Sequence, residues 1–403
     1  MTTEKDSGQS CLPGGLIPLD QWSTPDISVH KTLRAGFKDI LDQLRSGLAP
    51  ESEAFESLDD LPSLPAKKLS RYAPKPDAVA FASAILEQLE ALRQQGTHNR
   101  QLSFIVAPPF SGVSEALLTL PARVIEPPDN LLMTEQDADS WWDEQLNDDD
   151  WVLPELADFW LRHRSGLNLL KSFFARAALN NAGNGIVACS SWCWQFWVRY
   201  WPELHVGPLT LAPLDSERLT GWLDFLAHGG NGWSLTARMT NDGLYVLPPK
   251  TEESKEKYSC FMQDLANAAR GNRGVAHAIW QRALRAKPEE DAEQEKNGAG
   301  EGNAAECWVV PFDQLSLPGV PQGSGQQAGI VLHALLLHSG LTIDSLELVT
   351  GIAIRELKLV LSRFLRADLI QQDENTQAYQ LTPLGYPSVR KYLQARGFSV
   401  DGF

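Results

Sequence analysis

The chain has 403 residues, which is enough for two or three domains with a substantial core. Its formal net charge of −16 at pH 7 argues against broad affinity for nucleic acids or anionic membranes. The five cysteines form no CxxC pair and complete no zinc site, so a reducing, cytoplasmic compartment is expected. No stretch approaches the ~18 apolar residues of a membrane span, and residues 1–15 lack the apolar core of a signal peptide.

Residues 1–75 are predicted to be a flexible segment with one amphipathic helix. The helix is expected at residues 30–47, where apolar residues recur on one stripe and Gly47 follows as a stop. Residues 50–65 are acidic and contain proline, which is typical of a linker or a strap. The helix either docks a partner or packs on the main domain, and the sequence leaves both open.

Residues 76–228 are predicted to form an α/β domain, because short apolar strands alternate with helices. The expected strands are 103–107, 123–126, 151–156, 185–192 and 206–211. The expected helices are 77–95, one that begins at Ser114, 156–179 and 215–228. This order predicts a three-layer parallel sheet with a ligand crevice at the carboxyl ends of its strands. The acidic stretch at 130–150 is expected to be a solvated loop.

The loop after the first strand is the strongest local signal. It reads Ala107-x-x-x-x-Gly112-Val113-Ser114, and the P-loop pattern is G-x-x-x-x-G-K-S/T. A strand, a loop of phosphate size and a helix N-terminus thus come in the order used by P-loop nucleotide-binding proteins. The final glycine and serine are present, but the first glycine is Ala107 and the lysine is Val113.

These substitutions weaken the expected grip on phosphate. Val113 carries no charge, and Pro108 and Pro109 have no backbone N–H to offer an oxyanion. The Gly112 amide, the Ser114 hydroxyl and the helix dipole remain. A working ATPase, a weak nucleotide site and a strand-turn-helix that only builds the fold all stay open, and we favour the last.

Three further residues are candidates for a nucleotide site. Glu155 ends the third strand and either polarises water or begins a helix, while Pro154 stands where a metal-binding aspartate is expected. In P-loop ATPases of the AAA+ kind, the corresponding fourth strand ends in a polar sensor residue, and here Ser190 or Ser191 would take that place. Arg270 precedes a Gly-Asn-x-Gly turn and either contacts phosphate or caps a helix C-terminus.

Three C-terminal regions follow: a helical, lid-like region at 229–286, a linker with a short strand at 287–325, and a winged-helix pattern at 326–403. In the last region, Arg355, Lys358, Ser362 and Arg366 share the outer face of the third helix and are candidates for DNA or partner contact. The region has seven basic and seven acidic residues and is therefore neutral. We favour protein contact over DNA.

The order of these features resembles a degenerate STAND/AAA+ P-loop ATPase with a C-terminal winged helix. Members of these families use ATP to switch between assemblies and signal through a partner domain. Because Val113 and Pro154 replace the residues for phosphate and metal, the resemblance implies a non-catalytic, cytoplasmic scaffold or regulator that binds a protein partner and no cofactor. The alternatives are a nucleotide-dependent STAND-type switch that binds ATP or ADP with Mg²⁺, and a DNA-binding regulator.

Overall fold

The computed structural model describes residues 11–25, 62–96, 101–146, 149–202, 206–228, 234–248, 258–286, 304–323 and 325–403. The predicted helix at 30–47, and most of the acidic stretches at 50–65 and 287–305, lie outside these ranges. None of the described helices is both long and apolar enough to cross a membrane.

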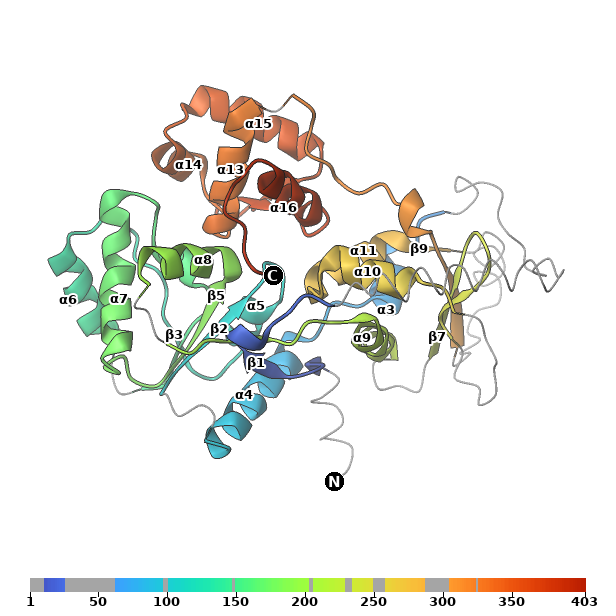
Figure 1. Cartoon of the computed structure of the whole chain (residues 1–403), viewed down its shortest axis with the longest axis horizontal. Helices are drawn as coiled ribbons and strands as arrows, with labels where there is room; N and C mark the ends of the chain where they lie inside the picture. Colours follow the sequence, from blue (N-terminus) through green and yellow to red (C-terminus); the bar gives the residue numbers. More distant parts are fainter. Residues whose placement is uncertain are drawn as a thin grey trace.

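A six-stranded sheet lies at the centre of the molecule, in the order β1-β6-β2-β5-β4-β3 (Figure 1). Its strands are β1 (Leu16–Pro18), β2 (Leu102–Ala107), β3 (Arg123–Val124), β4 (Trp151–Leu153), β5 (Gly185–Ser190) and β6 (Leu209–Leu211). The five strands from β2 to β6 pair in parallel, which confirms the predicted α/β architecture with a parallel core. β1 pairs antiparallel with β6 and so corrects the prediction that this part of residues 1–75 is flexible. Leu12 and Leu16 anchor it, because both are buried in the core.

Alternating side chains of β2 supply two separate cores. Phe104 and Val106 join the core on one face, and Ile105 and Ala107 join the core on the other. Helices α4 (Ala78–Gln94) and α5 (Val113–Leu117) cover the second face. The first face is covered by α6 (Glu135–Gln145), α7 (Asn168–Ala178) and α8 (Ser191–Tyr200). The sheet is therefore the middle of three layers, as in Figure 1.

Helix α6 corrects the prediction of a solvated loop at 130–150. Thr134 caps its N-terminus by accepting the Asp137 backbone N–H at 3.2 Å. Ala138 and Trp142, four residues apart, are fully buried, and the Trp142 ring lies 4.7 Å from that of Phe173. The high density of acidic residues hid this apolar stripe.

The single helix predicted at 156–179 is also wrong. The chain forms two short 3-10 helices, η3 (Leu156–Phe159) and η4 (Arg164–Leu167), before α7 begins. Trp160 between them is extended and fully buried against Phe196 and Trp197. Burying this large ring outweighs the local preference for a continuous helix.

A second, four-stranded sheet corrects the prediction that 229–286 is helical throughout. Its order is β8-β7-β10-β9, with β7 (Ser234–Met239), β8 (Tyr245–Leu247), β9 (Leu284–Arg285) and β10 (Ala304–Val309). β10 pairs in parallel with β7, which is distant in sequence, and so joins the strand predicted within 287–325 to this sheet. Helices α3 (Ala66–Tyr72), α9 (Ser216–His228), α10 (Phe261–Ala269) and α11 (Arg273–Ala283) lie between the two sheets (Figure 1).

The C-terminal region contains three helices, a hairpin and a fourth helix. They are α13 (Gly325–Leu337), α14 (Ile343–Thr350), α15 (Ile354–Arg366), β11 (Ile370–Gln372), β12 (Tyr379–Leu381) and α16 (Tyr386–Ala395). A short 3-10 helix, η5 (Phe312–Gln314), precedes them, and another, η1 (Leu19–Gln21), follows β1. The last residues pass back to the point where the C-terminal helices, the central sheet and α10–α11 meet (Figure 1).

Candidate functional site

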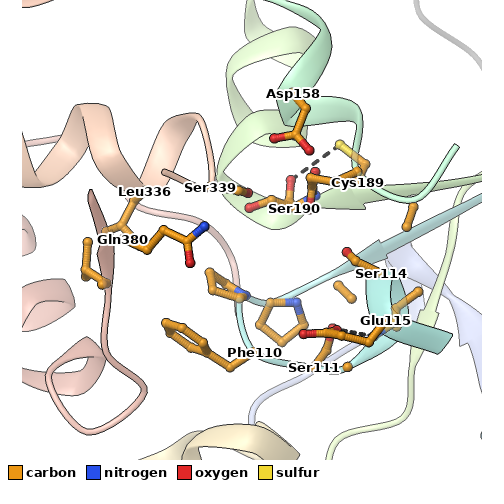
Figure 2. A pocket seen from close by; sticks show the side chains of 18 of the residues that line it. Phe110, Ser111, Ser114, Glu115, Asp158, Cys189, Ser190, Leu336, Ser339 and Gln380 are labelled. Atoms are coloured by element: carbon orange, nitrogen blue, oxygen red, sulfur yellow. Dashed lines mark hydrogen bonds between the residues drawn. The ribbon is translucent and has the colours of Figure 1, made fainter. Parts of the chain in front are cut away.

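A cavity of about 270 Å³ lies at the carboxyl ends of β2 and β5, where the C-terminal region covers the sheet. The sheet side contributes residues 107–115, the two acids Glu155 and Asp158, and residues 188–190. The C-terminal region contributes Leu335, Leu336, Ser339, Gln380 and Leu381. Figure 2 shows Asp158, Ser190 and Ser339 together on one side, with the Gln380 amide directed toward them and Phe110 and Glu115 across the space.

Five of the predicted nucleotide-site residues line this cavity: Ala107, Gly112, Val113, Ser114 and Glu155. Gly112 has a φ of +82°, a left-handed conformation that only glycine adopts without strain, and it forms the N-cap of α5. Val113 is buried in the core against α4, whereas Ser114 is half-buried. The lining residues include no lysine, arginine or histidine.

The loop is held by other parts of the same chain. The Asn272 side-chain amide, at the N-cap of α11, donates to the Pro109 carbonyl oxygen at 2.7 Å. Gly274 packs so closely that a Cβ at this position would lie 1.8 Å from the Phe110 carbonyl oxygen. The Phe110 ring itself packs edge-on against Tyr386 at 5.8 Å. The loop therefore contacts both α11 and α16.

Glu155 lines the cavity, and its carboxylate caps a short helix. Oε1 accepts the backbone N–H groups of Ala157 and Ser190, both at 3.0 Å. Burial and the nearby Asp158 raise the pKa of Glu155 to about 8, and burial raises the pKa of Asp158 to about 6. The cap agrees with the alternative that Glu155 begins a helix, and its place in the cavity leaves a ligand contact open.

Ser191 does not line the cavity. Its hydroxyl donates to Asp401, which is buried and forms an ion pair with Arg390 at 3.1 Å. The Trp192 indole N–H donates to the Tyr386 hydroxyl at 3.1 Å, and that hydroxyl lies 3.3 Å from Asp401. Of the two serines predicted as sensor candidates, Ser191 thus joins α8 to the C-terminal region, whereas Ser190 lines the cavity.

Arg270 also lies outside the cavity lining. It ends α10 in a left-handed conformation with a φ of +52°, and its Nε donates to the Phe403 backbone oxygen at 2.9 Å. This geometry fits the alternative in which Arg270 caps a helix C-terminus. Together with Trp22 and Pro108 it lines a narrow neighbouring space of about 20 Å³.

The four candidates on α15 lie far from this cavity on the outer surface of the C-terminal region. Arg355, Lys358 and Arg366 are exposed. Ser362 is half-buried, and its hydroxyl donates to the Leu359 carbonyl oxygen at 3.1 Å. The sequence pattern therefore places the three charged side chains correctly on an exposed face.

Sequence reasoning missed the cavity residues Asp158, Ser339 and Gln380. Asp158 lies within a stretch predicted to be helical, and the other two belong to a region that is far away in sequence. None of them is part of a motif, so only the packing of the C-terminal region on the sheet brings them to the site. The one local indication in the sequence was that Asp158 is a second acidic residue, three positions after Glu155.

No protein-family model matches the chain, and no curated protein matches its sequence. Two solved structures are similar to it in part. A RuvB variant of Thermotoga maritima is 11% identical with a TM-score of 0.30, over 86% of this chain and 99% of that one. The ORC2 protein of Aeropyrum pernix, in ADPNP and ADP complexes, is 12% identical with a TM-score of 0.29, over 94% of this chain and 97% of that one. Likeness at this level carries no functional conclusion.

Proposed function

We propose that the chain is a non-catalytic scaffold or regulator of the STAND/AAA+ type, with a P-loop-like strand, loop and helix, a lid formed by α10 and α11, and a C-terminal winged helix. The support is the order of the elements along the chain and the parallel strand order of the central sheet. Its α13–α16 region has the helix, helix, helix, hairpin order of a winged helix. Its function would then rest on protein contacts.

The proposal depends most on the loop between β2 and α5, which differs from a phosphate-binding loop in the groups that it offers a ligand. A phosphate-binding loop directs free backbone N–H groups and a lysine at the ligand. Here two loop positions are prolines, the lysine position is the buried Val113, and Asn272 of α11 binds the loop at Pro109. The cavity beside it holds carboxyl groups and no cation, so it repels a polyphosphate.

Equilibrium binding of ATP and ADP with Mg²⁺ tests this proposal on the intact chain. We expect no binding in the micromolar range by calorimetry and no phosphate release above a protein-free blank. Micromolar binding or measurable turnover that is lost in Ser114→Ala would overturn the scaffold proposal and support the nucleotide-dependent switch.

The exposed face of α15 supports a second candidate function, contact with DNA. Arg355, Lys358, Arg363 and Arg366 are exposed there, and Glu356 is the one acidic residue of this helix. A winged helix that binds DNA inserts its third helix into the major groove. The neutral charge of the region and the exposed Leu359 and Leu365 on the same helix favour protein as the partner.

Two assays separate these functions: capture of a partner protein by the intact chain, and gel shift with duplex DNA over a range of salt concentrations. A partner protein captured by the intact chain and lost in Arg355→Glu/Arg366→Glu supports the scaffold. A salt-dependent DNA shift that the same double variant abolishes supports the DNA-binding regulator. Glu374→Gln, on the exposed hairpin turn, serves as the matched control in both assays.

A further inference from the structure

The cavity beside the loop has a composition opposite to that of a phosphate site. Three carboxyl side chains line it: Glu115 from α5, Glu155 after β4, and Asp158 from η3. None of them forms an ion pair with another described residue. Among the residues that the structure describes, the cavity lining therefore offers no positive charge to balance these carboxyl groups.

A buried hydroxyl at the same cavity also lacks a partner. Ser190 ends β5, is 4% exposed and belongs to the lining. Its Oγ forms no hydrogen bond with any described residue. Leaving a buried hydroxyl unpaired costs about 1–3 kcal/mol, so such a group in a native structure calls for a partner. In Figure 2 the residue lies next to Asp158, and Glu115 lies across the space.

These groups together select among classes of ligand. An anion meets three carboxyl groups, and a neutral apolar molecule would desolvate them without compensation. Among the described residues, no three histidine, cysteine or acidic side chains converge as metal ligands do, which argues against a site that holds a metal ion by three such side chains. An ammonium group fits, because it is positively charged and its N–H groups can donate to carboxylates and to the Ser190 hydroxyl.

We propose that this cavity binds a small aliphatic amine, held by Asp158, Glu155 and the Ser190 hydroxyl and covered by the C-terminal region. The proposal rests on the proposed loss of nucleotide binding at the same cavity and assigns it a different ligand class. The space of about 270 Å³ is large enough to admit such a molecule. Ser339 and Gln380 reach the same space from the C-terminal region, so the ligand would contact both sides of the boundary.

The protonation of Glu155 offers a second way to detect the ligand. The pKa of Glu155 is raised to about 8 because its carboxyl is buried and lies near Asp158. Glu115, Asp158 and Cys189 are the other titratable groups of the lining, and none of them is positively charged. A bound ammonium group favours the ionised form of Glu155, so amine binding at pH 7 is expected to release protons.

The test is titration calorimetry of the intact chain with 1,4-diaminobutane at pH 7 and about 0.15 M salt, which screens loose attraction to the acidic surface. We expect 1:1 binding that weakens at least tenfold in Asp158→Asn and several-fold in Ser190→Ala. Glu144→Gln, an exposed acid on α6, is the matched control and should bind as the natural chain does. Repeating the titration in buffers of different ionisation enthalpy should reveal proton release that disappears in Glu155→Gln.

The outcomes distinguish this inference from the proposed function. Absence of diamine binding, or binding that Asp158→Asn leaves unchanged while its thermal unfolding shows a folded protein, overturns the amine site. If ATP with Mg²⁺ binds in the micromolar range, the scaffold proposal fails, whether or not the diamine also binds. If neither ligand binds, only the amine site is refuted.

Discussion

The Arg390 Nε donates to the Asp401 carboxylate at 3.1 Å, and the two side chains are 8% and 1% exposed. Asp401 also receives the Ser191 hydroxyl from α8, and a second Arg390 nitrogen donates to the Asp401 backbone oxygen at 2.9 Å. The last residues of the described chain are therefore tied at once to α16 and to the helix that follows β5. This buried pair is the polar centre of the boundary between the C-terminal region and the central sheet.

Removing one member of this pair should be strongly destabilising. Asp401→Asn leaves the Arg390 guanidinium buried without a counter-charge, and breaking a buried ion pair in this way costs about 3–5 kcal/mol. Chemical denaturation, followed by tryptophan fluorescence, measures the loss. The control Glu374→Gln changes an exposed acid and should stay within about 0.5 kcal/mol of the natural chain. A loss below 1 kcal/mol in Asp401→Asn would show that the pair contributes little.

The contact between α11 and the loop can be tested with two glycines. A Cβ at Gly274 would meet the Phe110 carbonyl oxygen at 1.8 Å, so Gly274→Ala must displace the loop or the helix. We expect a loss of about 2–4 kcal/mol in the free energy of unfolding, because backbone overpacking has no flexible side chain to yield. In Gly221→Ala, within α9, the new Cβ meets nothing within 4 Å, and this variant should gain up to about 1 kcal/mol. Equal effects of the two substitutions would contradict the close contact.

The raised pKa of Glu155 predicts the dependence of stability on pH. Its pKa is about 8 in the folded chain and about 4.5 in the unfolded chain, so the folded state binds more protons between these values. Stability should therefore fall as the pH rises, by up to about 1.4 kcal/mol per pH unit. Glu155→Gln, whose amide oxygen can still accept the two backbone N–H groups, should remove this slope. Urea denaturation at pH 6.5 and pH 8 measures it in a window that Asp158, with a pKa of about 6, affects little.

His338 predicts the opposite dependence on the acid side. Burial lowers its pKa to about 3, and its ring lies 4.5 Å from the Trp160 ring. Below pH 6.5 the unfolded state takes up a proton that the folded state refuses, so stability falls as the pH decreases toward 4. His338→Gln should weaken this acid dependence, although it also lowers stability at pH 7. His333, whose pKa is lowered to about 4 by burial and Arg162, and His277, whose pKa burial also lowers, contribute to the remaining slope. An unchanged slope in His338→Gln would show that His338 is protonated in the folded chain.

Much of the central sheet could be predicted from sequence because its strands are short apolar runs that end in turns. The loop at Gly112 and the cap at Glu155 were also recognisable, since both depend on residues close together in the chain. The break around Trp160 and the helix at Trp142 could not be predicted in the same way. In both places the burial of one large ring decides the backbone conformation, and the local pattern of charges points elsewhere.

The lack of a cation at the loop follows from the sequence alone, since Val113, Pro108 and Pro109 are local facts of composition. Which residues surround the loop was decided by the tertiary structure. Asn272 binds Pro109 across 163 positions of chain, and Asp401 meets Ser191 across 210. Periodicity and motifs report only on residues that are close together in sequence. Contacts across such long stretches of chain depend on how whole faces of helices and sheets pack together. For the same reason, the acids and the hydroxyl of the cavity became a site only in the folded chain.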